Sequence, residues 1–153
     1  MARFHFRLEP VLGHRERIES EKQRVFAEKL RDVVQAEADR DAAAGRRDAM
    51  RETLRRDHKS LDVDTLRATY AHLDYLDRLI VALEERLAAC RAEADRAHAA
   101  LIAAAKDRKV LETLKAQRRD AYDAQAALAE QRELDDANAR AFGRTKLQQG
   151  ITV

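Results

Sequence analysis

The chain has 153 residues, in which 30 lysines and arginines oppose 28 aspartates and glutamates, for a formal net charge of +2. Charged residues make up 38% of the sequence, while it holds one proline, four glycines and no tryptophan. This composition is typical of long helices and coiled coils. The two signs of charge are interspersed, which favours a solvated helix surface over a nucleic-acid interface. Many of the apolar residues are alanines, which bury little surface, so we expect a narrow seam and no wide core.

Cysteine and histidine give no sign of a metal or redox site. Cys90 is the single cysteine, which excludes an intramolecular disulfide and a cysteine cluster. No two histidines stand at a metal-ligand spacing, so we expect no metal and no cofactor. They are His5, His14, His58, His72 and His98. No apolar run reaches the length of a signal peptide or of a membrane span of about 18 residues. We therefore expect a cytoplasmic protein without direct membrane insertion.

The first predicted helix covers residues 10–57. Before it, Phe4, Phe6 and Leu8 alternate with polar residues over too short a stretch to indicate a strand. Pro10 fits the first turn of a helix, where its missing N–H costs nothing. Arg40 and Arg47 interrupt the apolar pattern, and we expect their stems to lie along a partner helix with their charged groups in water.

A turn is predicted at residues 58–64, where Asp62 or Asp64 can accept hydrogen bonds from free N–H groups and start a second helix. The second helix should then run over about 65–141, because no breaker appears before Gly143. Residues 142–153 are expected to be a frayed tail. The whole chain, 1–153, is predicted to be a single coiled-coil domain.

The second helix carries a heptad pattern. Its apolar positions alternate in spacing between three and four residues over more than five repeats, which indicates a left-handed coiled coil. The positions are Leu73, Leu76, Ile80, Leu83, Leu87, Cys90, Ala94, Ala97, Leu101, Ala104, Arg108 and Leu111, with Arg108 as the one misfit. The predicted fold class is therefore all-α, an antiparallel two-helix coiled-coil hairpin with an overhanging second helix.

The two helix lengths agree with this pairing. If the first helix starts near residue 10 and the turn lies at 58–64, residue 10 should lie near residue 112, which is where the heptad pattern stops. About thirty residues of the second helix, from about 112 to 141, would extend beyond the start of the first helix. The N-terminal Phe4, Phe6 and Leu8 could cover the first turns of this overhang.

Two surfaces lack an obvious partner within the predicted hairpin. Tyr75, Leu79, Ala82 and Arg86 form a stripe off the seam, which is either a docking patch or a surface packed on the first helix near its end. The overhang is basic over 106–119 and acidic over 120–136. It is either a binding element or a solvated helix, and the first interpretation is favoured because isolated helices of this length are marginal in water.

A rod of two helices has no pocket that could dehydrate a substrate. The sequence also lacks a glycine-rich phosphate loop and a nucleophile elbow. We therefore expect a protein that binds other proteins, and no enzyme.

The chain resembles the FliJ flagellar export proteins. The likeness begins with Phe4-His5-Phe6-Arg7-Leu8-Glu9-Pro10-Val11-Leu12, followed by Arg15 and Glu19. It continues in the stretch from Leu66 through Tyr75-Leu76 to Leu79-Ile80. It is closest at Lys106-Asp107-Arg108-Lys109-Val110-Leu111-Glu112-Thr113-Leu114-Lys115, followed by Arg118, Arg119, Tyr122, Glu130 and Leu134-Asp135-Asp136.

This resemblance implies a non-enzymatic component of the flagellar type III export apparatus, similar in fold to the rotor stalk of F-type ATP synthases. It implies binding to the hexameric export ATPase, to the cytoplasmic region of the membrane export gate and to export chaperones, with peripheral membrane association at the basal body. The residues that match the ATPase-facing part of the family are Arg7, Leu8, Lys109, Leu111, Leu114, Lys115, Arg118 and Tyr122. The gate-facing role falls on Tyr75, Leu79, Ala82 and Arg86.

Two alternatives remain open at this point. The chain could serve a virulence type III secretion system, which its sequence does not distinguish from the flagellar one. It could also be a structural scaffold that forms a dimer by burying Tyr75 and Leu79, without an ATPase partner.

Overall fold

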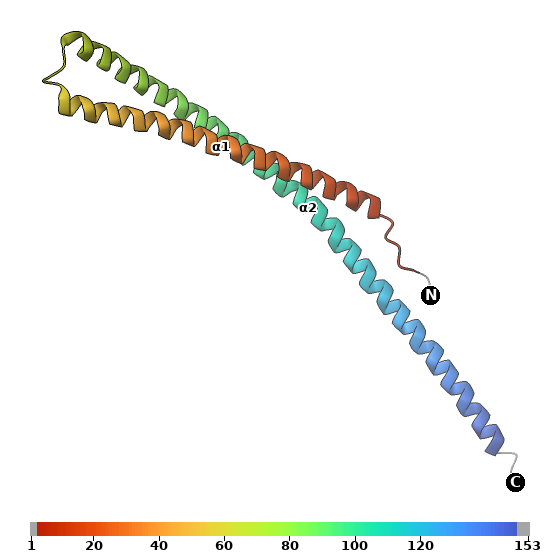
Figure 1. Cartoon of the computed structure of the whole chain (residues 1–153). Helices are drawn as coiled ribbons and strands as arrows, with labels where there is room; N and C mark the ends of the chain where they lie inside the picture. The colour runs from red at the N-terminus through yellow and green to blue at the C-terminus, as the bar shows by residue number, and fades with distance from the viewer. Residues whose placement is uncertain (1–2, 150–153) are drawn as a thin grey trace. The chain divides into compact units, whose positions relative to one another are not determined.

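The computed structural model describes residues 3–149, and they form two helices and no strand. Helix α1 comprises Glu9–Asp57 and helix α2 comprises Val63–Gln149 (Figure 1). The all-α hairpin predicted from the sequence is thus confirmed. The contacts group the chain into two compact units, Arg15–Lys106 and Met1–His14 with Asp107–Val153.

Local hydrogen bonds set the ends of the helices. The N–H of Glu9 donates to the carbonyl of Phe6 at 3.0 Å and begins α1, with Pro10 in its first turn. Asp62 caps α2, because its Oδ1 accepts a hydrogen bond from the N–H of Thr65 at 2.9 Å. Hydrogen bonds from the side chain and the backbone of Thr65 hold the pKa of Asp62 below its usual range.

The unit Arg15–Lys106 is an antiparallel hairpin, and its seam follows the heptads. Leu73, Leu76, Ile80 and Leu87 of α2 are buried. All the other predicted seam positions of this unit are buried or half-buried. On α1, the buried residues are Ala36, Ala43 and Leu54. Alanine at fully buried positions lets two helix backbones approach closely, as a narrow seam requires.

Ion pairs flank this seam and establish the antiparallel direction. Lys29 pairs with Glu93 at 2.6 Å, Glu37 with Arg91 at 2.7 Å and Asp39 with Arg86 at 3.2 Å. Arg51 and Arg47 approach Asp77 at 3.1 and 3.6 Å. The partner number on α2 falls as the number on α1 rises.

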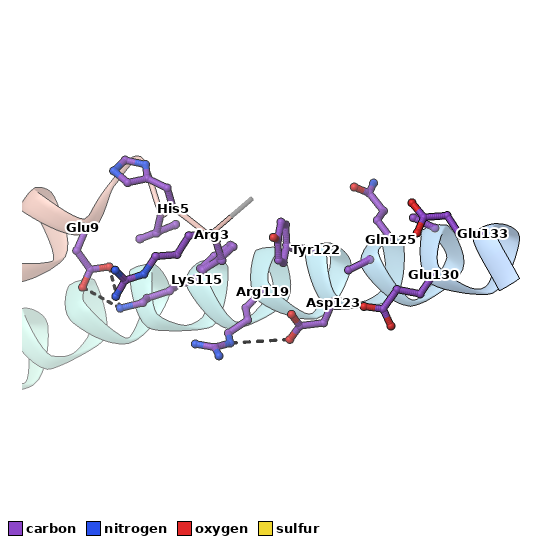
Figure 2. A pocket seen from close by; sticks show the side chains of 14 residues that line it. Arg3, His5, Glu9, Lys115, Arg119, Tyr122, Asp123, Gln125, Glu130 and Glu133 are labelled. Atoms are coloured by element: carbon purple, nitrogen blue, oxygen red, sulfur yellow. Dashed lines mark hydrogen bonds and ion pairs between the residues drawn. The ribbon is translucent and has the colours of Figure 1, made fainter. Parts of the chain in front are cut away.

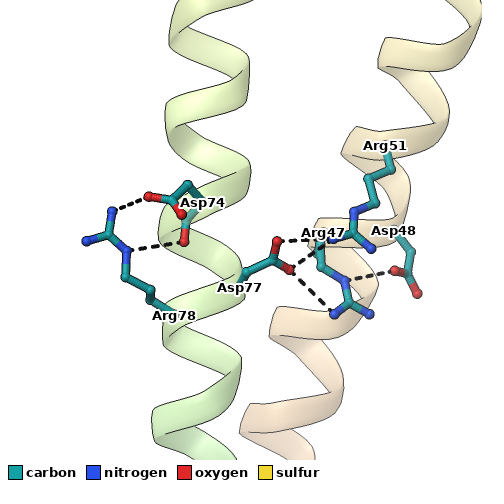
Figure 3. A network of polar contacts seen from close by, with 6 residues as sticks. All are labelled: Arg47, Asp48, Arg51, Asp74, Asp77 and Arg78. Carbon is teal, nitrogen blue, oxygen red and sulfur yellow. Dashed lines mark hydrogen bonds and ion pairs between the residues drawn. The ribbon is translucent and has the colours of Figure 1, made fainter.

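Figure 3 shows the carboxylate of Asp77 directed from α2 towards the guanidinium groups of Arg47 and Arg51 on α1. Arg78 instead pairs with Asp74 on its own helix. The charged group of Arg47 was expected at the surface, and about a quarter of its side chain is exposed. Arg47 also forms an ion pair with Asp48, at 3.1 Å.

The helix ends differ from the prediction at three points. Helix α1 begins one residue earlier, at Glu9, and α2 begins at Val63, directly after the Asp62 cap. The predicted frayed tail is wrong for residues 142–149, since α2 continues to Gln149; residues 150–153 lie outside the described part. One glycine within a helix costs only about 1 kcal/mol relative to alanine, and the good helix formers around Gly143 offset that cost.

In the other unit, the start of α1 packs against α2. Phe6 and Leu12 are buried, and Glu9 pairs with Lys115 at 2.8 Å. The predicted proximity of residue 10 to residue 112 agrees with this pair. Arg108, the misfit of the heptads, is half-buried and pairs with Glu112 one turn further on, at 2.5 Å.

Candidate protein-binding surfaces

The N-terminal residues before α1 lie over α2. The ring of Phe4 packs against that of Tyr122, with centroids 5.6 Å apart, and the guanidinium carbon of Arg119 lies 6.0 Å from the Phe4 centroid. Such cation–π and tilted ring contacts add to simple burial. As predicted, this aromatic segment covers α2 beyond the start of α1.

An open groove of about 1160 Å³ runs beside this contact. Its walls include Arg3 and His5 on one side and α2 residues as far as Glu133 on the other. Figure 2 shows Tyr122, Gln125 and Glu133 on one side of α2, and Arg119, Asp123 and Glu130 on the other. The groove is open to solvent, and it therefore differs from the closed pocket that dehydration of a substrate would require.

A smaller cavity of about 340 Å³ lies in the same unit. Its lining consists of His5, Phe6, Arg7, Leu8 and Arg118. It combines three basic side chains with two apolar ones and contains no carboxylate.

The distal part of α2 packs against no other helix among the described residues. Every side chain described from Ala127 to Arg144 is exposed, and Leu134 keeps 64% of its surface accessible. Leu128 and Phe142 are also large exposed apolar side chains. Exposed apolar groups on a long single helix are typical of an element that binds a partner.

The residues predicted to face an ATPase all lie in this unit. The half-buried ones are Leu8, Leu111, Leu114, Lys115 and Tyr122. Arg7, Lys109 and Arg118 are exposed. Arg7, Leu8 and Arg118 line one cavity, whereas Lys115 and Tyr122 are engaged by Glu9 and Phe4.

The residues predicted to face an export gate lie in the unit Arg15–Lys106. Tyr75 is 54% exposed and stacks on His72, with ring centroids 5.9 Å apart. Leu79 is half-buried, while Ala82 and Arg86 are exposed. The guanidinium of Arg86 donates a hydrogen bond to Asp39 of α1. The Arg86 end of the stripe thus contacts α1, whereas the side chain of Tyr75 at the other end is exposed to solvent.

A further groove of about 540 Å³ lies beside the turn. Leu54 and Leu73 are its apolar lining residues, Arg51 and Arg55 line it from α1, and Tyr70 lines it from α2. Tyr70 is exposed. The α2 residues that line the groove lie next to Tyr75, at the start of the stripe.

The polar interactions of both units are those of a protein surface. Among the side chains that the structure describes, no buried nitrogen or oxygen lacks a hydrogen bond, and no charged side chain is buried. The hydrogen bond from Lys29, together with its charge, lowers the pKa of Glu93, and Glu93 in turn raises the pKa of Lys29. These shifts arise from exposed ion pairs and give no sign of a catalytic acid or base.

The described residues contain neither a metal site nor a membrane span. No group of three or more potential ligands gathers in the part of the chain that was searched. None of the helical segments within residues 3–149 is long and apolar enough to cross a membrane.

The sequence-based site omitted His5, Phe6 and Arg119. From the sequence, Phe6 was expected only to cover the first turns of the overhang. Arg119 was part of the basic stretch 106–119 and had no separate role. His5 is adjacent in sequence to both phenylalanines. It also belongs to the N-terminal stretch that resembles the FliJ proteins, but the resemblance gave it no role of its own.

Comparison with known proteins identifies a family. The family model described as "Flagellar FliJ protein" matches residues 4–147. No curated protein and no solved structure matches the chain. The matched range covers α1, nearly all of α2 and the N-terminal segment from Phe4, so the chain belongs to the FliJ family of flagellar export proteins.

Proposed function

We propose that the protein is a non-enzymatic stalk of the flagellar type III export apparatus. The unit that contains Glu9 and the distal part of α2 binds the hexameric export ATPase. The hairpin unit binds the cytoplasmic region of the membrane export gate and so holds the protein at the basal body. Export chaperones are further partners, which the stalk escorts to the gate.

The observation that carries this proposal is the exposed distal helix. Residues 127–142 leave their apolar side chains accessible, and a single helix of this kind is marginal in water unless a partner packs on it. The surrounding residues match the FliJ family throughout. A ring ATPase offers a central opening that suits one long helix.

The open end of the Tyr75 stripe supports the gate-binding role. Tyr75 combines a large apolar ring with a polar hydroxyl group, and tyrosine is enriched in protein interfaces. Its exposure in the hairpin leaves it available to a partner.

The ATPase role is tested with the full-length chain and the purified export ATPase. We expect the ATPase to retain the chain and its hydrolysis rate to change on addition of the chain. Lys109→Glu should weaken retention, whereas Arg67→Glu, a matched charge reversal in the other unit, should not. No retention together with an unchanged hydrolysis rate would overturn the ATPase role.

The gate role is tested separately. Tyr75→Ala should weaken binding to the cytoplasmic region of the gate while leaving ATPase retention unchanged. If sedimentation instead finds a dimer of the free chain that Tyr75→Ala dissociates, the stripe is a self-association surface and the gate assignment is wrong.

A further inference from the structure

We propose that the cavity lined by His5, Arg7 and Arg118 is a carboxylate-binding subsite, which receives an aspartate or glutamate side chain of the protein partner. This inference rests on the proposed ATPase binding and names the chemistry by which that partner is recognised. The cavity lies in the unit assigned to the ATPase, and it opens between the residues that precede α1 and one turn of α2.

Arg7 and Arg118 differ from the cations that pair with carboxylates across the two helices. Lys29, Arg51 and Arg91 each meet a carboxylate of the facing helix, and Lys115 meets Glu9. Within residues 3–149, neither Arg7 nor Arg118 has an ion pair. Other exposed cations of this range, such as Arg46 and Lys109, also have no ion pair. What distinguishes Arg7 and Arg118 is that they line one cavity together without a carboxylate in its lining.

Helix geometry explains why Arg118 is not compensated locally. Residues three and four positions apart on a helix are neighbours. For Arg118 these are Leu114, Lys115, Ala121 and Tyr122, none of which is acidic. The adjacent Arg119 does have such a partner, Asp123, at 3.8 Å. No acidic neighbour on α2 therefore occupies the paired donors of Arg118, which leaves them available to a carboxylate of a partner.

The lining indicates a carboxylate on an aliphatic stem. The planar guanidinium group offers paired N–H donors that match the two oxygens of a carboxylate. Phe6 and Leu8 supply apolar surface beside them. The volume of about 340 Å³ lies at the lower end of the range of about 300–1,000 Å³ for ligand pockets, which suits a side chain better than a nucleotide.

The backbone argues against a phosphate ligand. Phosphate sites at helix ends use free backbone N–H groups. At the start of α1, the N–H of Glu9 already donates to Phe6, and that of Leu12 donates to Leu8. Pro10 has no N–H to offer. Two of the first N–H groups of α1 are therefore already engaged and a third is missing, which leaves a weaker backbone site for phosphate than a helix start usually offers.

The test measures the affinity of the full-length chain for the purified export ATPase. Arg118→Glu should weaken binding by about tenfold to a hundredfold, as expected for the loss of charge-assisted hydrogen bonds. Arg118→Lys keeps the charge without the paired donors and should cause a smaller loss. Arg67→Glu makes the same charge change in the other unit and should bind like the wild type.

A double-mutant cycle tests whether one carboxylate is shared. If Arg7 and Arg118 hold the same group, the losses for Arg7→Ala and Arg118→Ala will not be additive. Additive losses would show two separate contacts and overturn the subsite. Helical content by circular dichroism should be unchanged in each variant, since both side chains are exposed.

Competition identifies the ligand chemistry. A polyglutamate peptide should displace the ATPase from the wild-type chain more effectively than inorganic phosphate at equal charge. Equal or stronger displacement by phosphate would overturn the carboxylate assignment. If the wild type binds and Arg118→Glu binds equally well, the subsite is wrong while the ATPase role stands. If the wild type itself does not bind, both are wrong.

Discussion

Replacement of Leu76 by alanine tests whether the heptad seam supplies the stability of the hairpin. Leu76 keeps only 2% of its surface exposed, between the buried Leu73 and Ile80. The substitution removes three carbons, worth about 0.8 kcal/mol each on transfer from water, or about 2.4 kcal/mol in all. Incomplete collapse of the resulting cavity adds to this value, so we expect the free energy of unfolding to fall by about 2.5–4 kcal/mol.

The adjacent Tyr75→Ala is the matched control, because it removes a larger side chain that is 54% exposed. We expect it to change the free energy of unfolding by less than about 0.5 kcal/mol, as is usual for surface positions. Urea denaturation followed by circular dichroism measures both variants. If Tyr75→Ala destabilises the chain as much as Leu76→Ala, Tyr75 belongs to the core, and the docking role assigned to its stripe is wrong.

Three further outcomes are expected. Ala36→Leu, at a position with no exposed surface, should lower the free energy of unfolding by about 1–3 kcal/mol through overpacking, whereas Ala42→Leu on the exposed face should be nearly neutral in the same denaturation assay. Asp62→Ala should lower the melting temperature, since it removes the cap of α2, and Asp62→Asn, which keeps a capping oxygen, should recover most of the loss. Lys29 lowers the pKa of Glu93 in the folded state, so the unfolded state binds more protons in acid. The pair therefore stabilises the folded state above the ordinary carboxyl pKa of 4.5, and this stabilisation is lost as the pH falls through the lowered value. Melting curves of Glu93→Gln and wild type should differ at neutral pH and converge in acid.

Most of the fold follows from local sequence patterns. The spacing of Leu73, Leu76, Ile80 and Leu87 determines which face of α2 is buried, independently of the sequence of the facing helix. The number of residues on each side of the turn determines which segments of the two helices lie side by side. The cap at Asp62 was one of two candidates, because an aspartate at either position offers the same carboxylate. The hydrogen bond from the N–H of Thr65 to Asp62 identifies Asp62 as the cap. The end of α2 was misplaced because one glycine was weighted above its favourable neighbours.

The small basic cavity could not be predicted from spacing. Arg7 and Arg118 belong to segments that approach only in the folded chain, and neither segment alone shows that its arginine lacks a carboxylate. The resemblance to the FliJ family selected Arg7, Leu8 and Arg118 for the site. It could not add His5 or Phe6, whose contribution depends on the path of the backbone before α1.

The size of the buried side chains changes along the α2 seam. Leucine and isoleucine occupy its buried positions from Leu73 to Leu87, and alanine occupies the buried positions Ala94 and Ala104, with Leu101 half-buried between them. Less apolar area is buried per turn at the alanines, so local opening costs less free energy there than near the turn. Native-state hydrogen exchange should therefore find a gradient, with the slowest amides near Ile80. Such a gradient would mean that the hairpin opens locally at its alanine positions without global unfolding.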